Sequence, residues 1–473
     1  MSDTHPRQVY LLSPRSLSPE TIAVTFAKTS RSPLSFREIA AELTDEKSSE
    51  FHEKWVVGYG HASVAEHAVL HIAFENVSRL AIETIESNRL ASYTEKSTRY
   101  QRWDADSFYV PLEVIGTEHE DLYRSTCREL FEAYLASLEP VRKVVQGRVP
   151  RNEGESDARW DGRIRARYVD VCRFLLPAAA LANVGMTANA RTLEHAIRKM
   201  LSHPLDEVRQ AGLEMRQAAS AEVPTLLKYA DPTPYARAAE RRLQEVAAEL
   251  EGPAEEAVRL VAYDLDGEDR VLAAALYPSA QAPYEAVLDN VRGQTAEGRR
   301  RLAEAMLGGR GAHDVPLRAL EHTAYTFEVV VDQGGYFELK RHRMMTQTPQ
   351  RLTTGLGYSV PALIVDAGLG PEYRQALDRA DRSYRKLAAW NAEVAAYLVP
   401  NACRRRVLLT ANLREIFHFC ELRSAANAHF SIRRIALGVA EAVRRVHPSL
   451  ASYLRLPEGA DRQSLESEHF AEV

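Results

Sequence analysis

Two short runs of residues have the side-chain types of an anion-binding site. Residues 341–343 read Arg-His-Arg, and Glu95, Ser97 and Arg99 combine an acceptor, a hydroxyl and a guanidinium within five positions. A guanidinium binds phosphate through two parallel hydrogen bonds, and a hydroxyl or backbone N–H beside it completes a phosphate cradle. A carboxylate can then fix a ribose or a ring N–H, so these are the parts of a nucleotide site. On chemistry alone, an Arg-His-Arg triplet is more often a solvated charge cluster, and a run such as Glu95-Lys-Ser-Thr-Arg99 is usually a surface loop.

Each run lies in a block with the same plan. Residues 323–331 alternate apolar and polar side chains, the period-two pattern of a strand with one buried face, and a Glu-His pair at 321–322 precedes them. The earlier block has a Glu-His pair at 66–67 and a strand-like stretch through 70–74. The repeated plan predicts two diverged copies of one unit.

The remaining periodicity predicts further elements in the same order. Residues 8–29 predict a strand followed by a helix that starts at Ser18-Pro-Glu. A helix is expected from about Thr117, and the polar residues 148–165 predict a solvated loop. In the second copy, one helix is expected to run through His418, Arg423 and Ile432.

Short strands mixed with long helices in each half predict an α+β fold class, with helices packed on a small, mainly antiparallel sheet. We expect residues 1–235 to form the first copy, a charged helical linker at 236–254, and residues 255–473 to form the second copy. A duplication with an internal pseudo-twofold axis is the simplest architecture.

Composition excludes several function classes. The net charge of −5 gives no global basic field, which argues against nucleic-acid binding. The apolar runs are far too short for a membrane span, and the N-terminal residues do not resemble a signal peptide. The four cysteines have no metal-ligand spacing and are expected to be buried free thiols. We therefore expect a cytoplasmic protein without a metal site.

The motifs resemble those of the flavin-dependent thymidylate synthases. The resemblance rests on Gly60-His-x-Ser-x-x-Glu-His67, on residues 89–100, which contain Glu95-Lys-Ser-Thr-Arg99, and on the Arg-His-Arg at 341–343. It covers both halves of the chain. It implies FAD and dUMP bound between α/β protomers of a homotetramer-like assembly, with NADPH and methylene-tetrahydrofolate as co-substrates.

The resemblance also implies roles for individual residues. Arg423 would be catalytic and would stabilise negative charge on the uracil ring. Substrate-binding residues would be Glu95, Lys96, Ser97, Thr98, Arg99, Arg173, Glu338, Arg341 and Arg423. Cofactor-binding residues would be Ser63, Glu95, Arg341, His342, Arg343, Asn412, Arg414 and His418.

Each copy departs from the family pattern on a different side of the site. The first copy keeps the substrate loop and Arg173, but it has Ser87-Asn88-Arg89 in place of Arg-His-Arg. It also has Lys199 or Met200 in place of the late arginine, the family arginine near the end of each copy that contacts the uracil. The second copy keeps the Arg-His-Arg and the late arginine, Arg423. In its loop, Pro349, Arg351 and Thr353 replace the family's Glu, Ser and Arg. Outside the loop, Ala396 replaces the arginine that precedes the Leu-Val-Pro run at 398–400, Asn427 replaces a histidine, and Glu338 replaces a glutamine.

These losses are complementary, so we predict composite sites that take one wall from each copy, with about one flavin per chain. We expect a homodimer of the chain, a pseudo-tetramer of four copies, that methylates dUMP to dTMP. Two alternatives stay open at this point: a related flavoenzyme acting on another pyrimidine nucleotide, and a non-catalytic nucleotide- or flavin-binding paralogue.

Overall fold

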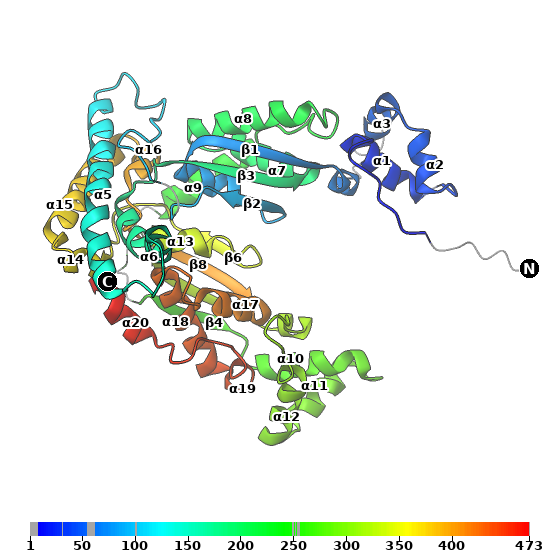
Figure 1. Ribbon diagram of the computed structural model, residues 1–473. Coiled ribbons are helices and arrows are strands. Elements are labelled where there is room, and N and C mark those ends of the chain that lie inside the picture. The colour runs from blue at the N-terminus through cyan, green and yellow to red at the C-terminus, as the bar shows by residue number, and fades with distance from the viewer. Residues whose placement is uncertain are drawn as a thin grey trace, which may run out of the picture. The chain divides into compact units, whose positions relative to one another are not determined.

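A computed structural model describes residues 8–30, 32–53, 62–99, 102–247, 250, 252 and 256–472, and the predicted Gly60-His61 lies outside them. The chain forms two compact units (Figure 1). Unit 1 comprises Met1–Ser97, Phe108–Thr117 and Ala179–Leu250. Unit 2 comprises Thr98–Ser107, Glu118–Ala178 and Glu251–Val473. Unit 2 therefore contains segments from both sequence copies.

Unit 1 is built on a three-stranded antiparallel sheet of order β1-β3-β2 (Figure 1). Leu70 and Phe74 on β1 are buried, as the alternating pattern predicts. Ser78 ends β1 and caps the next helix, because its hydroxyl accepts a hydrogen bond from the Ala81 N–H. The elements of unit 1 are α1 (Pro19–Thr29), α2 (Phe36–Ala41), α3 (Asp45–His52), η2 (Ala62–His67), β1 (Val69–Ser78), α4 (Arg79–Glu86), β2 (Ala91–Glu95), β3 (Leu181–Asn189), α7 (Ala190–Leu201), α8 (Asp206–Ser220) and α9 (Pro234–Ala247).

Unit 2 is built on a four-stranded antiparallel sheet of order β4-β5-β8-β6. Its first-copy helical elements are α5 (Glu120–Arg148), α6 (Asp157–Cys172) and η3 (Arg173–Leu175). Its second copy begins with β4 (Val258–Tyr263), α10 (Gly267–Leu276), η4 (Tyr277–Ser279), α11 (Tyr284–Arg292), α12 (Ala296–Leu307), η5 (Arg318–His322), β5 (Ala324–Asp332), α13 (Gln333–Leu339) and β6 (Thr346–Pro349). It continues with β7 (Val360–Pro361), α14 (Ala362–Asp366), α15 (Gly370–Trp390), α16 (Ala392–Ala395), η6 (Ala396–Leu398), β8 (Arg404–Asn412), α17 (Leu413–Arg423), α18 (Phe430–Val446), α19 (Pro448–Ala451), α20 (Arg462–His469) and β9 (Phe470–Glu472).

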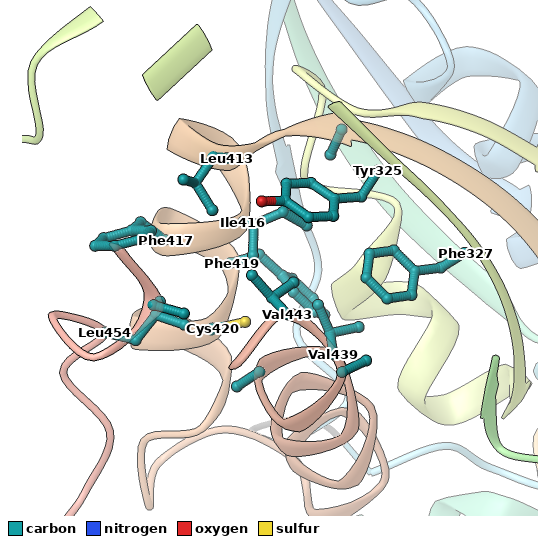
Figure 2. Close-up of a cluster of buried hydrophobic side chains, with 14 of the residues drawn as sticks. Tyr325, Phe327, Leu413, Ile416, Phe417, Phe419, Cys420, Val439, Val443 and Leu454 are labelled. Atoms are coloured by element: carbon teal, nitrogen blue, oxygen red, sulfur yellow. The ribbon is translucent and has the colours of Figure 1, made fainter. Parts of the chain in front are cut away.

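The core of unit 2 lies between its sheet and the helices α17 and α18. Tyr325 and Phe327 of β5 point toward Ile416 of α17 and toward Val439 and Val443 of α18 (Figure 2). All five side chains are at most 1% exposed. The buried face of β5 is the face that the alternating sequence pattern predicts.

The registers of the two sheets establish which residues of the copies are equivalent. Val69 of β1 faces Asn189 of β3, and Ala324 of β5 faces Asn412 of β8. Asn189 and Asn412 both cap the helix that follows, α7 and α17 respectively. The antiparallel sheets, the matching registers and the matching caps confirm the predicted α+β class with tandem copies.

The third strand of each sheet extends this correspondence into the loops. Ser92 of β2 faces Thr187, and Thr346 of β6 faces Thr410. Counting from these pairs, Glu95 is equivalent to Pro349 and Arg99 is equivalent to Thr353. The second copy therefore lacks both charged groups at these two loop positions.

Equivalent segments of the two copies also pair with each other inside unit 2. Pro177 and Pro400, each following a short 3-10 helix, form an antiparallel bridge. The Ala178 N–H donates to the Val399 carbonyl at 3.0 Å, and the Asn401 N–H donates to the Leu176 carbonyl at 3.0 Å. This reciprocal pattern is what a local pseudo-twofold axis produces.

Several sequence-based expectations about elements were wrong. Residues 8–18 form no strand in the described chain, although Ser18 does cap α1. The expected loop 148–165 ends at Ser156, which caps α6; this helix was missed because its exposed first turns are charged rather than periodic. The helix expected through Ile432 is two helices, since α17 ends at Arg423 and His429 caps α18.

The four cysteines are buried and free, as predicted. Burial raises the pKa of the Cys172 and Cys403 thiols to about 12, so neither is a nucleophile near neutral pH. Among the described residues, none of the helices is both long enough and apolar enough to span a membrane.

Candidate functional site

One wall of the candidate site is built by first-copy residues in unit 2. Arg99 donates to both carboxylate oxygens of Asp170, with its Nη2 at 2.7 Å from Oδ2. Arg173 forms an ion pair with the same carboxylate at 3.0 Å and donates to the Thr98 hydroxyl at 2.6 Å. Asp170 thus holds two predicted substrate-binding arginines side by side.

The other wall is built by second-copy residues of α13, α17 and the run that follows α13. Arg423, the last residue of α17, donates from Nη1 to Glu338 at 2.8 Å and from Nε to Nε2 of His342 at 2.9 Å. The His342 Nδ1–H donates to Glu415 at 2.9 Å. The guanidinium of Arg423 is therefore held from two sides by groups of its own copy.

Arg99 joins the two walls. Its Nη2 lies 3.7 Å from Oε1 of Glu338, and its Nη1 donates to the Asn427 carbonyl at 3.0 Å. His429 adds two further links, because its N–H donates to Glu338 and its ring Nε2–H donates to the Asp170 carbonyl, each at 3.2 Å. Arg99 from the first copy and Arg423 from the second thus contact the same carboxylate.

Close backbone packing fixes the helix that carries Glu338. A Cβ on Gly334 would lie 2.7 Å from a ring carbon of Phe174, so glycine lets α13 approach the first-copy residues. Asn401 donates from its side chain to the Arg173 carbonyl at 2.9 Å, which ties the first wall to the second copy as well. These contacts hold both walls on rigid elements.

Burial and neighbouring charges together set the protonation states in the cluster. Burial lowers the pKa of His342, and its bond to Glu415 does not overcome this effect, so the ring is neutral and Nε2 accepts from Arg423. Burial likewise lowers the pKa of His429. Burial alone would raise the pKa of Asp170, but Arg173, His429 and Arg99 outweigh it and the pKa is lowered.

The residues predicted to contact a cofactor are distributed around the second wall. Arg341 is exposed, and its charge helps to lower the pKa of Arg423, although burial is the larger cause. The exposed His418 ring lies 5.4 Å from the His342 ring. Arg414 donates to the Pro316 carbonyl and to Glu321, both at 2.9 Å. Asn412 caps the N-terminus of α17, and Arg343 follows His342 and is partly exposed.

Four other predicted site residues belong to unit 1. Glu95 ends β2 and forms an ion pair with Arg79 at 3.1 Å. The exposed Lys96 donates its backbone N–H to the Asn183 carbonyl, Ser97 follows it partly exposed, and Ser63 is exposed on η2. Their roles in ligand binding stay predictions.

Sequence reasoning missed three groups that organise the cluster: Asp170, Glu415 and His429. Asp170 precedes Arg173 by three residues, a spacing that places both on one side of a helical turn, and this signal could have identified it. Glu415 and His429 gave no comparable signal, because their partners are far away in the sequence.

The fold and the cluster define a tandem-duplicated α+β protein whose copies contribute arginines to one shared cluster. The family model "Thymidylate synthase complementing protein" (Thy1) matches residues 12–225 and 259–449, one match for each copy. The chain therefore belongs to this family.

Relatives of two lengths resemble the chain. A UPF0159 protein of Chlamydia muridarum is 32% identical over 88% of this chain and 82% of its own length. The UPF0159 protein Ta1429 of Thermoplasma acidophilum is 29% identical over 89% and 91%. A flavin-dependent thymidylate synthase of Clostridium tetani is 28% identical over 46% of this chain but 84% of its own length, the proportion expected if one synthase corresponds to one copy.

Proposed function

We propose that this protein is an FAD-dependent thymidylate synthase that methylates dUMP reductively at a composite site of its two copies. The observation that carries the proposal is the contact of Arg99 and Arg423 with Glu338. These arginines come from opposite walls of the predicted site, and each is the one that the other copy has lost. The halves that the two copies have kept would thus form one site within one compact unit.

The arginines divide the ligand between them. Arg99 and Arg173 would bind the phosphate, since both guanidiniums are already held by one carboxylate and the Arg173 partner Thr98 adds a hydroxyl. Arg423 would stabilise negative charge that develops on the pyrimidine ring. His342 would act as a positioning residue, because its neutral ring accepts from Arg423 and fixes the direction of the guanidinium.

The cofactor side has donors that fit an anionic dinucleotide. Arg341 and His418 are exposed beside His342 and Arg423, and Arg343 is partly exposed, so their donors can reach a flavin phosphate or ring. Bound FAD would supply hydride transfer, with NADPH as reductant and methylene-tetrahydrofolate as one-carbon donor. The residues around it would bind, orient and exclude water.

Glu338 favours a second candidate, a flavoenzyme acting on another pyrimidine nucleotide. Its carboxylate lies between Arg99 and Arg423 and only accepts hydrogen bonds. A pyrimidine with an exocyclic amino group would offer it a donor, whereas a carbonyl oxygen at that position would be repelled. A non-catalytic paralogue that only binds nucleotide or flavin is the third reading, and comparison of turnover with binding separates it from the first two.

Replacing Glu338 by glutamine is expected to tighten dUMP binding by about tenfold or more. A unit charge 4 Å from an anion costs about 1 kcal/mol in water and about 4 kcal/mol at an effective dielectric constant of 20. Glutamine keeps the shape and the acceptor for the His429 N–H but removes that charge. Calorimetric titration measures the change, with Glu372→Gln at the start of α15 as the control. Unchanged or weaker dUMP binding would place the anion away from Glu338.

Anaerobic turnover tests the proposed function. The flavin-loaded protein is reduced and mixed with methylene-tetrahydrofolate and either dUMP or the corresponding cytosine nucleotide, and the nucleotide products are separated. Formation of dTMP supports the proposal, and conversion of a cytosine nucleotide instead supports the second candidate. Tight binding without any product supports the non-catalytic reading.

We also propose that the working state is a homodimer in the cytoplasm. Light scattering on the purified protein tests whether the chain forms a homodimer.

A further inference from the structure

We propose that unit 1 carries a second ligand site, built on Lys199, that binds a small oxyanion such as a phosphate monoester or a carboxylate. Strand register makes Asn88 the equivalent of His342 and Thr84 the equivalent of Glu338. In the second copy Arg423 contacts His342, and in the first copy Lys199 contacts Asn88. Lys199 therefore takes the position of the late arginine, although strict helix register would place Met200 there.

The cation in this first-copy cluster has different partners from Arg423. Nζ of Lys199 lies 2.5 Å from the Ser87 hydroxyl oxygen and 3.0 Å from Oδ1 of Asn88, and both partners are neutral. Asn88 is fixed because its Nδ2 donates to the Ile85 carbonyl, so its oxygen is the atom that faces the ammonium. Among the described residues, Lys199 makes no ion pair with a carboxylate, whereas Arg423 has Glu338.

The described residues around Lys199 leave the charge of its ammonium without a carboxylate partner. Thr84, the equivalent of Glu338, is neutral and lies 3.3 Å from Nε2 of His203. Burial lowers the pKa of Lys199 to about 8. Burial, Arg209 and Lys199 lower the pKa of His203 to about 4, so His203 is neutral and adds no counter-charge at pH 7. An ammonium of this kind is stabilised by a bound anion more strongly than a surface lysine is.

The cluster is reachable and offers more than one donor. Ser87 is exposed and Lys199 is partly exposed, so a small solute can approach the ammonium. The Ser87 hydroxyl donates to the Thr84 carbonyl at 2.6 Å and can turn toward an incoming oxygen. A lysine ammonium binds phosphate or carboxylate as a point charge, without the fixed geometry that a guanidinium demands. A small oxyanion is therefore the class of ligand that fits.

Site-resolved acylation of the intact protein tests this inference. Lysines are labelled with acetic anhydride at pH 8, with inorganic phosphate, acetate or dUMP, or with sodium chloride at equal ionic strength, and modified peptides are quantified by mass spectrometry. A bound anion that raises the pKa of Lys199 by about one unit slows its labelling about fivefold at this pH. Lys143, exposed on α5, serves as the control and should not respond.

The three probes distinguish the source of the anion. Protection by phosphate and dUMP alone indicates a nucleotide or phosphate ester, and protection by acetate as well indicates any small oxyanion. If none of them slows the labelling of Lys199 relative to chloride, the proposal is overturned. Hydrogen exchange of residues 84–91 gives the second readout: phosphate should slow it in the parent protein and not in Lys199→Met. Equal protection in both would also contradict the site.

Discussion

Replacing Arg423 by lysine is expected to lower the rate of dUMP methylation by about 10²–10³-fold, the usual cost of losing one preorganised donor at a developing negative charge. Arg423 uses Nε for His342 and Nη1 for Glu338, so its orientation is set by two groups at once. Lysine has one nitrogen and cannot reproduce this fork. Single-turnover measurement with the reduced, flavin-loaded protein reports the rate.

The control for this substitution is Arg445→Lys, an exposed arginine on α18. Arg445→Lys should leave the rate unchanged. In Arg423→Lys, the affinity for dUMP should change far less than the rate. A lysine variant that turns over within threefold of the parent protein would contradict the electrostatic role given to Arg423. Circular dichroism of both variants checks that α17, which ends at this residue, stays folded.

Replacing Arg99 by alanine is expected to weaken dUMP binding by roughly 30-fold or more, because losing one partner of a buried charged pair costs about 2–5 kcal/mol. Arg99 bridges Asp170 and Glu338, and its side chain is 22% exposed, so its guanidinium can reach a ligand. Asp170 keeps Arg173 as a partner in the variant, which limits the loss of stability. Calorimetric titration with dUMP gives the affinity.

The duplication supplies a matched control for Arg99. Thr353 occupies the equivalent position in the second copy, and Thr353→Ala should leave dUMP and flavin binding nearly unchanged, as should Arg351→Ala at another decayed position. Arg341→Ala and Arg99→Ala should each abolish activity. Equal losses at Thr353 and at Arg99 would mean that the two copies contribute alike and that the decayed side is not vestigial.

Local pattern predicted β1, β5 and several helices because the spacing of apolar residues reports directly on a buried face, but it did not identify the other strands of the two sheets. The alternation of Tyr325, Phe327 and Val329 identified β5 and its inner side. Pattern failed at α6, where charged residues cover the first turns and Ile164 is the only buried residue before Tyr168. Periodicity records burial and does not say which copy covers a face, so the division of the first copy between two compact units was not foreseen.

The candidate site was partly predictable for a similar reason. Motif residues Arg99, Arg173, His342 and Arg423 could be named in advance, and the structure brings them into one network. Of the acids that hold them, Glu415 could not be named, since its partner His342 is far along the chain, whereas Asp170 was marked only by its three-residue spacing from Arg173. The choice between Lys199 and Met200 could not be made from the sequence either, because side-chain reach, and not register, puts Lys199 against Asn88.

The most direct test of the composite site is the number of dUMP molecules that bind to each chain. Calorimetric titration of the flavin-loaded protein, with its concentration fixed by amino-acid analysis, counts these sites. We predict one tight dUMP per chain, because Arg99 and Arg423 occur together once and their equivalents Thr353 and Lys199 cannot rebuild the same walls. Two equal sites per chain, or no dUMP binding in the presence of flavin, would contradict the account.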